Sequence, residues 1–494
     1  MTTIAVSLIS HTNAGKTTLA RTLLGEDVGE VADAPHVTTE AASFPLLKSP
    51  EGDVLMLWDT PGFGNSRRLA GRLAQQGSPI GWFLSQVWDR FRDRSFFLTQ
   101  LAVRNVRDHA DVAVYLVNAA EAPEGAGYLA SEMELLQWID KPVIVLLNQV
   151  GTPHAEPAAA DQLAAWHEAL KAYPQVREVL ALDAFARCWV QEYTLFRRLR
   201  RVLSGEKKAA IERLMAAWEA GQWARFDAAM EALAMPIATA AVARIIVPPQ
   251  PRFRWLADAL GLRGRKREGG LDSAARSRAR ELMQRLADDQ RDSIGQLLAI
   301  HGLEGEASTE LAALLESDVI TRAPIDESQA GLIGGILSGA TTGLATDLAT
   351  GGLTLGGGLL AGTVLGALAG FGIARGVNVV RGETGTSVQW GTTFLEGLVT
   401  TALLRYLAVA HFGRGRGTWQ EDECLPAWRL LVERVVAARQ PALAEIWALR
   451  EGDGVDASPG TQLVSELVSE LAGMARTLLN ELYPDVLPSL REAA

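Results

Sequence analysis

The sequence of 494 residues predicts an α/β domain with a mostly parallel sheet and helices on both faces, followed by an all-α region. Short apolar runs alternate with longer helical patterns in the first part, and a Gly-Lys-Thr turn follows the first run. The later pattern is helical and rich in Ala, Leu, Glu and Arg. The chain is too long to fold around one hydrophobic core. We therefore predict four parts: an α/β domain at 1–200 with an insertion at 64–109, a helical domain at 201–325, a glycine-rich apolar helical hairpin at 326–382 and a C-terminal helical region at 383–494.

The apolar runs of the first part are predicted strands, and they lie at 4–10, 53–59, 111–117, 142–148 and 178–184, with a shorter edge strand at 43–48. Helices are predicted to begin at Lys16 and near Tyr128, Pro157 and Val190. In a fold of this order the ligand-binding loops lie at the carboxyl ends of the strands. Candidate functional residues are therefore sought there.

Charge and cysteine content exclude several classes of protein. The formal net charge is −11, which argues against a nucleic-acid partner. Cys188 and Cys424 form no metal-ligand cluster and no disulfide framework, as expected in a reducing compartment. The opening residues MTTIAVSLIS lack a basic region, so we expect a first strand there and no cleaved export signal.

The segment SHTNAGKTT at 10–18 matches most of the phosphate-loop pattern G-x-x-x-x-G-K-[ST]. In that pattern backbone amides cradle phosphates at a helix N-terminus, the Lys contacts the β and γ oxygens, and the hydroxyl contacts Mg²⁺. Ser10 replaces the first glycine with another small residue. The predicted phosphate contacts are Ala14, Gly15, Lys16, Thr17 and Thr18, with Lys16 catalytic and Thr17 on Mg²⁺.

A second motif, DTPG at 59–62, follows the next predicted strand. Asp59 there can hold a Mg²⁺-bound water, and the amide of Gly62 can reach a γ-phosphate in a catalytic role. Between the two motifs, VTTE supplies a threonine that can close over the metal. We predict Thr39 for this catalytic and Mg²⁺ contact, with Thr38 as the alternative.

The segments SHTNAGKT, VTTE, DTPG and LLNQVG resemble the G motifs of translation-factor-class GTPases, in the branch that includes Era and MnmE. The resemblance implies a P-loop GTPase domain that binds GTP or GDP with Mg²⁺. Asn13 matches a position that coordinates K⁺ in that branch. Phe63 stands where other GTPases place a water-orienting Gln. Slow hydrolysis assisted by a monovalent cation is therefore expected.

The same resemblance is weaker at the base-recognition motif. Where N-K-x-D is usual, this chain has Asn148 and Gln149, with Gly151 in place of the Asp. Asn148 can tie the pocket to the phosphate loop, and Gln149 can lie against the base. Asp183 and Ala184 stand where a Ser-Ala-Lys loop would contact it. The resemblance favours GTP over ATP, but the missing Asp leaves both open.

A second resemblance covers nearly the whole chain. The segments LDAFARCWVQE at 182–192 and LLRYLAVAHFGRGRG at 403–417 resemble a bacterial GTPase family whose C-terminal half is a domain of unknown function. This resemblance implies an architecture and leaves the biological purpose open.

Two further segments have patterns that allow both a structural and a functional interpretation. Residues 81–109 mix aromatic and Arg side chains at helical spacing; we favour an enlarged helix packed on the sheet over an amphipathic segment that contacts a partner or membrane. Residues 331–376 contain 15 glycines in 46 positions, many recurring every fourth residue. Such a glycine zipper predicts a tightly packed helical hairpin, inserted in a membrane or buried in protein.

These patterns together predict a GTP-binding protein, a slow cation-assisted GTPase whose nucleotide cycle controls the conformation or assembly of a membrane-associated helical C-terminal half. The alternatives are a nucleotide-stabilised scaffold with little hydrolysis and an Era-like GTPase that acts on RNA or the ribosome. Expected partners are a guanine nucleotide, a protein or second copy bound through the helical half, and a membrane contacted by 331–376. The expected location is cytoplasmic, at the inner face of the cell membrane if the hairpin inserts.

Overall fold

The computed structural model describes residues 1–11, 14–25, 41–76, 94–118, 121–148, 157–182, 188–247, 271–303, 377–382, 385–411, 425–450 and 457–483, together with Val486. The chain forms two compact units. The first comprises Met1–Ala224, Ala410–Cys424 and Leu479–Glu492, and the second comprises Arg225–Val409, Leu425–Leu478 and Ala493–Ala494. The predicted hairpin segment 331–376 lies outside the described residues, and the boundaries of the four predicted parts stay predictions.

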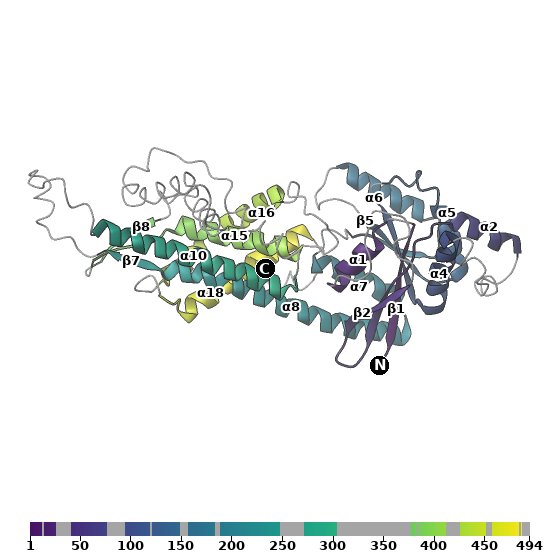
Figure 1. Cartoon of the computed structure of the whole chain (residues 1–494), viewed down its shortest axis with the longest axis horizontal. Coiled ribbons are helices and arrows are strands. Elements are labelled where there is room, and N and C mark those ends of the chain that lie inside the picture. Colours follow the sequence, from purple (N-terminus) through teal and green to yellow (C-terminus); the bar gives the residue numbers. More distant parts are fainter. Residues whose placement is uncertain are drawn as a thin grey trace, which may run out of the picture. The chain divides into compact units, whose positions relative to one another are not determined.

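The first unit contains a six-stranded sheet in the order β2-β3-β1-β4-β5-β6 (Figure 1). All neighbouring strands are parallel except β2, an antiparallel edge strand, so the predicted α/β fold is confirmed. The central strand β1 has its carboxyl end beside those of β3 and β4. The strands are β1 Thr3–Ser10, β2 Ala42–Lys48, β3 Val54–Asp59, β4 Val112–Asn118, β5 Val143–Asn148 and β6 Val176–Ala181.

Helices cover both faces of this sheet, as predicted. Alternate side chains of β4 enter two different hydrophobic clusters, because successive strand residues point to opposite faces. Helices α2, α4, α5 and α6 contribute to the cluster on one face, and α1, α7 and the start of α8 contribute to the other. These helices are α1 Lys16–Leu24, α2 Ser66–Gln76, α4 Arg94–His109, α5 Leu129–Ile139, α6 Pro157–Leu170, α7 Trp189–Val202 and α8 Gly205–Val242.

The described part of the insertion, helix α4, packs on the sheet. Phe96, Val103 and Val106 of α4 are fully buried in the same cluster as Ile9 of β1 and Tyr115 of β4. The interpretation as an enlarged packing helix is therefore confirmed for residues 94–109. Residues 77–93 lie outside the described part of the chain.

The second unit is predominantly helical, as predicted, and it also contains a three-stranded antiparallel sheet in the order β7-β9-β8 that the sequence analysis missed. Among the described residues, one helix, α15, is long and apolar enough to cross a membrane, and most of it is buried inside the protein. The elements that complete this unit are α10 Leu271–Ile300, α15 Thr392–Ala410, α16 Leu425–Ala438, α17 Gln440–Ala448, α18 Thr461–Leu482, β7 Arg244–Val247, β8 Val377–Gly382 and β9 Gly385–Trp390.

Candidate nucleotide site

The loop between β1 and α1 requires glycine at position 15. Gly15 is the N-cap of α1 and has a φ of +87°, in the left-handed region that residues with a Cβ rarely occupy. A Cβ there would lie 2.7 Å from Nδ2 of Asn148. That amide donates a hydrogen bond of 3.0 Å to the carbonyl oxygen of Ala14, so Asn148, at the end of β5, holds the loop as predicted.

The first position of the loop does not require glycine. Ser10 ends β1, and Asp140 is the one non-glycine residue with positive φ among the described residues, so the backbone of Ser10 has ordinary geometry. The Oγ atom of Ser10 accepts a hydrogen bond of 2.8 Å from Nζ of Lys16. The substitution is thus compatible with the turn and gives the lysine a partner.

The ammonium of Lys16 is held in a buried environment beside two acids. Burial lowers the pKa of Lys16 from its ordinary value, and the charges of Asp59 and Glu132 oppose this effect. Lys16 is the first residue of α1, at the end of the helix where backbone amides attract anions. A phosphate group there would replace Ser10 as the hydrogen-bond partner.

Asp59, at the end of β3, lies beside the start of α1. Its Oδ2 accepts a hydrogen bond of 2.8 Å from Oγ1 of Thr17. Burial raises the pKa of Asp59, opposed first by the Thr17 hydrogen bond and then by the charges of Lys16 and Arg21. Its Oδ1 is buried and has no hydrogen-bond partner among the described residues. A carboxylate with an unused buried oxygen next to a threonine hydroxyl is a donor set that fits Mg²⁺ or its bound water.

The segment after Asp59 is anchored to β1. The hydroxyl of Thr60 donates to the carbonyl oxygen of Leu8 at 2.6 Å, and the amide of Phe63 donates to that of Ser10 at 2.9 Å. These bonds hold Gly62 close to the end of β1. The ring of Phe63 is fully buried in the core, so it offers no group that could orient a water molecule.

The structure brings together most of the predicted site at one edge of the sheet. These residues lie in the β1–α1 loop, at the start of α1, at or just after the end of β3, and at the end of β5: Ala14, Gly15, Lys16, Thr17, Asp59, Gly62 and Asn148. Thr18 is buried within α1. The remaining predicted residues lie outside the described part of the chain: Asn13, Thr38, Thr39, Gln149, Gly151, Asp183 and Ala184.

Sequence reasoning missed Glu132, an acid of α5 that is fully buried next to this site. Its Oε1 lies 2.7 Å from Nδ1 of His11, the second residue of the loop. A signal was present in the sequence: the buried positions of α5 recur at helical spacing, and Glu132 occupies one of them. An acid on the apolar face of a helix marks a buried polar contact.

The first part of the chain is similar in sequence to known GTPases. A family model described as "50S ribosome-binding GTPase" matches residues 5–149. GTPase Era from Heliobacterium modesticaldum (strain ATCC 51547 / Ice1) is 26% identical over 168 residues, which are 33% of this chain and 46% of that relative. The chain therefore spans about half the length of the curated relative that it matches.

Solved structures with some similarity include a variant of Aquifex aeolicus Era bound to GDP·AlF4⁻, which is 20% identical with a TM-score of 0.31, covering 42% of this chain and 59% of that one. A bacterial selenocysteine-specific elongation factor is 15% identical with a TM-score of 0.27, covering 41% and 29% respectively.

A second family model, described as "Domain of unknown function (DUF3482)", matches residues 172–430, which is more than half of the chain. Both resemblances read from the sequence are thus confirmed. The first unit contains an Era-like P-loop GTPase domain, and the chain belongs to the DUF3482 family.

Proposed function

We propose that the protein binds guanine nucleotide with Mg²⁺ at the carboxyl edge of the six-stranded sheet and hydrolyses GTP slowly. The observation that carries this proposal is the arrangement of Lys16, Thr17 and Asp59, in which Asp59 Oδ1 is buried without a described partner. This arrangement would be complete with a divalent ion and a phosphate chain, because they supply the missing charges and partners.

Each residue of the proposed site has a separate role. The Lys16 ammonium and the amides at the start of α1 bind the phosphate oxygens, while the hydroxyl of Thr17 and the carboxylate of Asp59 hold Mg²⁺ and its water. The ion supplies charge stabilisation to the transferring phosphoryl group. The amide of Gly62 is the proposed contact for the γ-phosphate, and Thr39 is the proposed residue that closes over the metal.

We propose slow turnover because of the residue after Gly62, and cation assistance because of Asn13. The buried ring of Phe63 cannot orient the attacking water, as Gln does in other GTPases. Asn13 is the proposed K⁺ ligand. For the base, Gln149, Asp183 and Ala184 are the proposed contacts, and we propose GTP over ATP on the strength of the family match.

Phosphate release from GTP and ATP, in potassium and in sodium, tests this function. We expect GTP turnover in potassium that falls to background in sodium and in the variant Lys16→Ala. Equal background rates for wild type and variant would rule out hydrolysis and leave the nucleotide-stabilised scaffold. Higher turnover of ATP than of GTP would contradict the proposed base preference.

For the second unit we propose that the nucleotide cycle controls a helical half associated with the inner face of the cell membrane through residues 331–376, with a protein partner or a second copy. The glycine spacing of that segment supports the proposal. Flotation with liposomes should capture the full chain, and deleting 331–376 should abolish capture. Equal behaviour of the two chains would favour a hairpin buried in protein.

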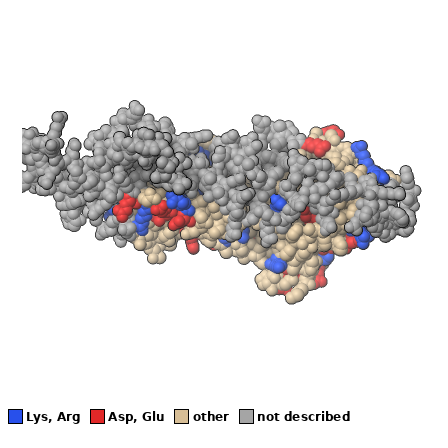
Figure 2. All heavy atoms as spheres, viewed as in Figure 1, with Lys and Arg blue, Asp and Glu red and all other residues tan. Residues whose placement is uncertain are grey.

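An Era-like role on the ribosome is the alternative. The matching family is described as ribosome-binding, and one solved structure of Era contains a segment of 16S ribosomal RNA. Against it stands the formal net charge of −11. Figure 2 shows acidic and basic side chains interspersed over the described part of the face in view, with no extended basic surface there. Cosedimentation with ribosomal subunits in the presence of a GTP analogue would favour this alternative.

A further inference from the structure

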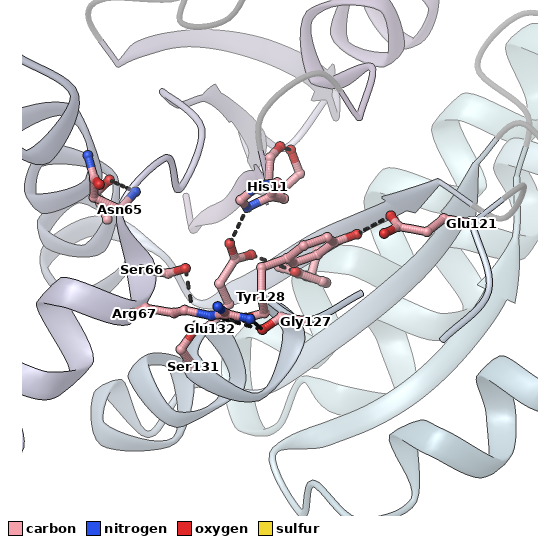
Figure 3. A network of polar contacts seen from close by, with 12 residues as sticks. His11, Asn65, Ser66, Arg67, Glu121, Gly127, Tyr128, Ser131 and Glu132 are labelled. Atoms are coloured by element: carbon pink, nitrogen blue, oxygen red, sulfur yellow. Dashed lines mark hydrogen bonds and ion pairs between the residues drawn. The ribbon is translucent and has the colours of Figure 1, made fainter. Parts of the chain in front are cut away.

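The carboxylate of Glu132 is a meeting point for three elements around the proposed nucleotide site (Figure 3). Its side chain is 0% exposed. Its Oε1 lies 2.7 Å from Nδ1 of His11 in the phosphate loop, and its Oε2 accepts a hydrogen bond of 2.6 Å from the hydroxyl of Tyr115 in β4. The side chain of Ser66, the first residue of α2, also lowers the pKa of this carboxylate.

Burying a carboxylate on a helix face that otherwise packs in the core costs desolvation free energy. Burial raises the pKa of Glu132, and the hydrogen bond and charge of His11, followed by Tyr115 and Ser66, oppose this effect. Apolar side chains of similar volume often replace buried polar networks without loss of stability. The network is therefore better explained by the positions that it imposes on its partners than by stability.

His11 is also held from its other side. Its ring stacks on Tyr128, with centroids 4.0 Å apart and planes within 9°, and the hydroxyl of Tyr128 donates to Glu121 at 2.8 Å. Figure 3 shows His11 above Glu132, to which a dashed line joins it, with Tyr128 close by. With one edge fixed by a carboxylate and one face by a ring, the imidazole has little freedom. These contacts therefore also restrict the position of the phosphate loop, which carries His11.

The start of α2 makes further contacts with α5, the helix that carries Glu132, and with the residue Gly127 just before it. Nε of Arg67 donates to the carbonyl oxygen of Gly127 at 3.1 Å, and Oγ of Ser131 lies 3.4 Å from Oγ of Ser66. Ser66 and Arg67 follow closely after Gly62, which we place at the γ-phosphate. Contacts that fix the start of α2 therefore also restrict the segment that carries Gly62.

We propose that Glu132 is a positioning residue, which sets the phosphate loop, through His11, in register with the segment after Gly62, through Ser66. This inference rests on the proposed function, since it concerns the geometry of hydrolysis at that site. Glu132 touches no nucleotide atom in this scheme. Its loss should misalign the two halves of the site more than it weakens nucleotide binding.

The test is the variant Glu132→Gln, which keeps the side-chain volume and removes the charge. We expect kcat for GTP to fall roughly tenfold or more, because small displacements of catalytic groups cost large factors in rate. The dissociation constant for GDP and the KM should change by less than about threefold. A kcat within about twofold of wild type in a folded variant would overturn the inference.

The matched control is Asp53→Asn, which alters another buried carboxylate of the same domain. Asp53 accepts hydrogen bonds from Thr2 and Arg213 at the opposite edge of the sheet. This variant should lower the melting temperature and leave kcat unchanged. An equal fall in kcat for both variants would show that any loss of buried charge impairs the domain, and the assigned role of Glu132 would be wrong.

A double-mutant cycle separates positioning from a general structural effect. If Glu132 acts through His11, then adding Glu132→Gln to His11→Asn should lower kcat little further. Additive losses would contradict the coupling. If Glu132→Gln fails to fold, His11→Asn and Ser66→Ala give the answer, because both should lower kcat, and wild-type rates in both would overturn the proposal. Absence of GDP binding by the wild type would instead refute the proposed function itself.

Discussion

Buried carboxylates at the two ends of the strands, called here the amino edge and the carboxyl edge of the six-stranded sheet, differ in how their charges are paired. At the amino edge, Asp53 accepts from the amide of Thr2 at 2.8 Å and from Nε of Arg213 at 2.6 Å. Asp111 accepts from the amide of Ala5 at 2.9 Å and is paired with Lys207. The Arg213 hydrogen bond is the main reason that the pKa of Asp53 lies below its ordinary value.

At the carboxyl edge the pKa values of the buried carboxylates are shifted in the opposite direction. Burial raises the pKa of both Asp59 and Glu132, because their hydrogen bonds and neighbouring charges do not fully offset it. Carboxylates that complete their pairing within the chain hold the sheet to α8. Of the two carboxylates with raised pKa, Asp59 lies where a divalent ion is proposed to bind and Glu132 lies next to that site; functional sites are where perturbed pKa values concentrate. The amino ends of the strands therefore carry carboxylates that are paired within the chain, and the carboxyl ends carry the proposed ligand site.

The largest effect is expected at the carboxyl edge from Gly15→Ala. A side chain there must adopt a φ of +87° and displace the amide of Asn148. Strain of about 1–3 kcal/mol together with loss of the loop's anchor should weaken GDP binding on the order of a hundredfold. Titration of a fluorescent GDP analogue measures this loss.

Gly25→Ala is the control for that variant. Gly25 also has a positive φ, +69°, but a Cβ there would meet nothing within 4 Å. We expect a lower melting temperature with nearly unchanged GDP affinity. If both glycine variants lost affinity equally, backbone strain alone would explain the effect, and the contact with Asn148 would be irrelevant.

Asp59→Asn is expected to remove the dependence of binding on Mg²⁺. Removing the metal with EDTA should weaken GTP binding by wild type by tenfold or more, and by much less in the variant, because the carboxylate that holds the ion or its water is gone. Asp111→Asn at the amino edge should keep the wild-type response to EDTA. An equal EDTA effect in all three proteins would contradict the assignment of the metal to Asp59.

Asp53→Asn should affect stability in a pH-dependent way. The folded-state pKa of Asp53 lies below its unfolded value of about 3.9, so its ion pair contributes fully above that pH and is lost as the pH falls through the folded pKa. Wild type should therefore melt a few degrees higher than the variant at pH 7, and the difference should shrink toward zero at strongly acidic pH. A difference independent of pH would mean that the charge of Asp53 does not matter.

The smallest effect is expected from Ser10→Gly. The hydroxyl of Ser10 is the partner of Lys16 in this structure, but phosphate oxygens would take over that role in the complex. The backbone at Ser10 also needs no glycine. GDP affinity and GTP turnover should change by less than about threefold, under ~0.7 kcal/mol. A loss of affinity beyond tenfold would show that the hydroxyl remains in use with nucleotide bound.

Much of the first unit could be predicted because its signals are local. Apolar runs gave the strands, and the helix starts at Lys16 and near Tyr128, Pro157 and Val190 agree with α1, α5, α6 and α7. Thr17 and Asp59, both predicted to contact Mg²⁺, lie within hydrogen-bond distance of each other, since parallel neighbouring strands end on the same side of the sheet. Contacts at Asn13, Thr39 and the base-binding residues stay predictions.

The features that were missed depend on distant parts of the chain. The sheet of the second unit pairs Ile245 with Val388 across a long separation in sequence, and such short strands carry no periodic signal of their own. Glu132 meets His11, Ser66 and Tyr115 only after β1, α2, β4 and α5 have packed. Local periodicity identifies Glu132 as buried, but it cannot name the partners that a tertiary fold supplies.

Calorimetric titration of the full chain with GDP and Mg²⁺ tests the central claim most directly. We expect saturable binding of one nucleotide per chain, weakened strongly by Lys16→Ala and by EDTA, and left intact by Asp53→Asn at the opposite edge of the sheet. Absence of binding heat from wild type with GDP, GTP and ATP, each with Mg²⁺ and at several temperatures, would contradict the account.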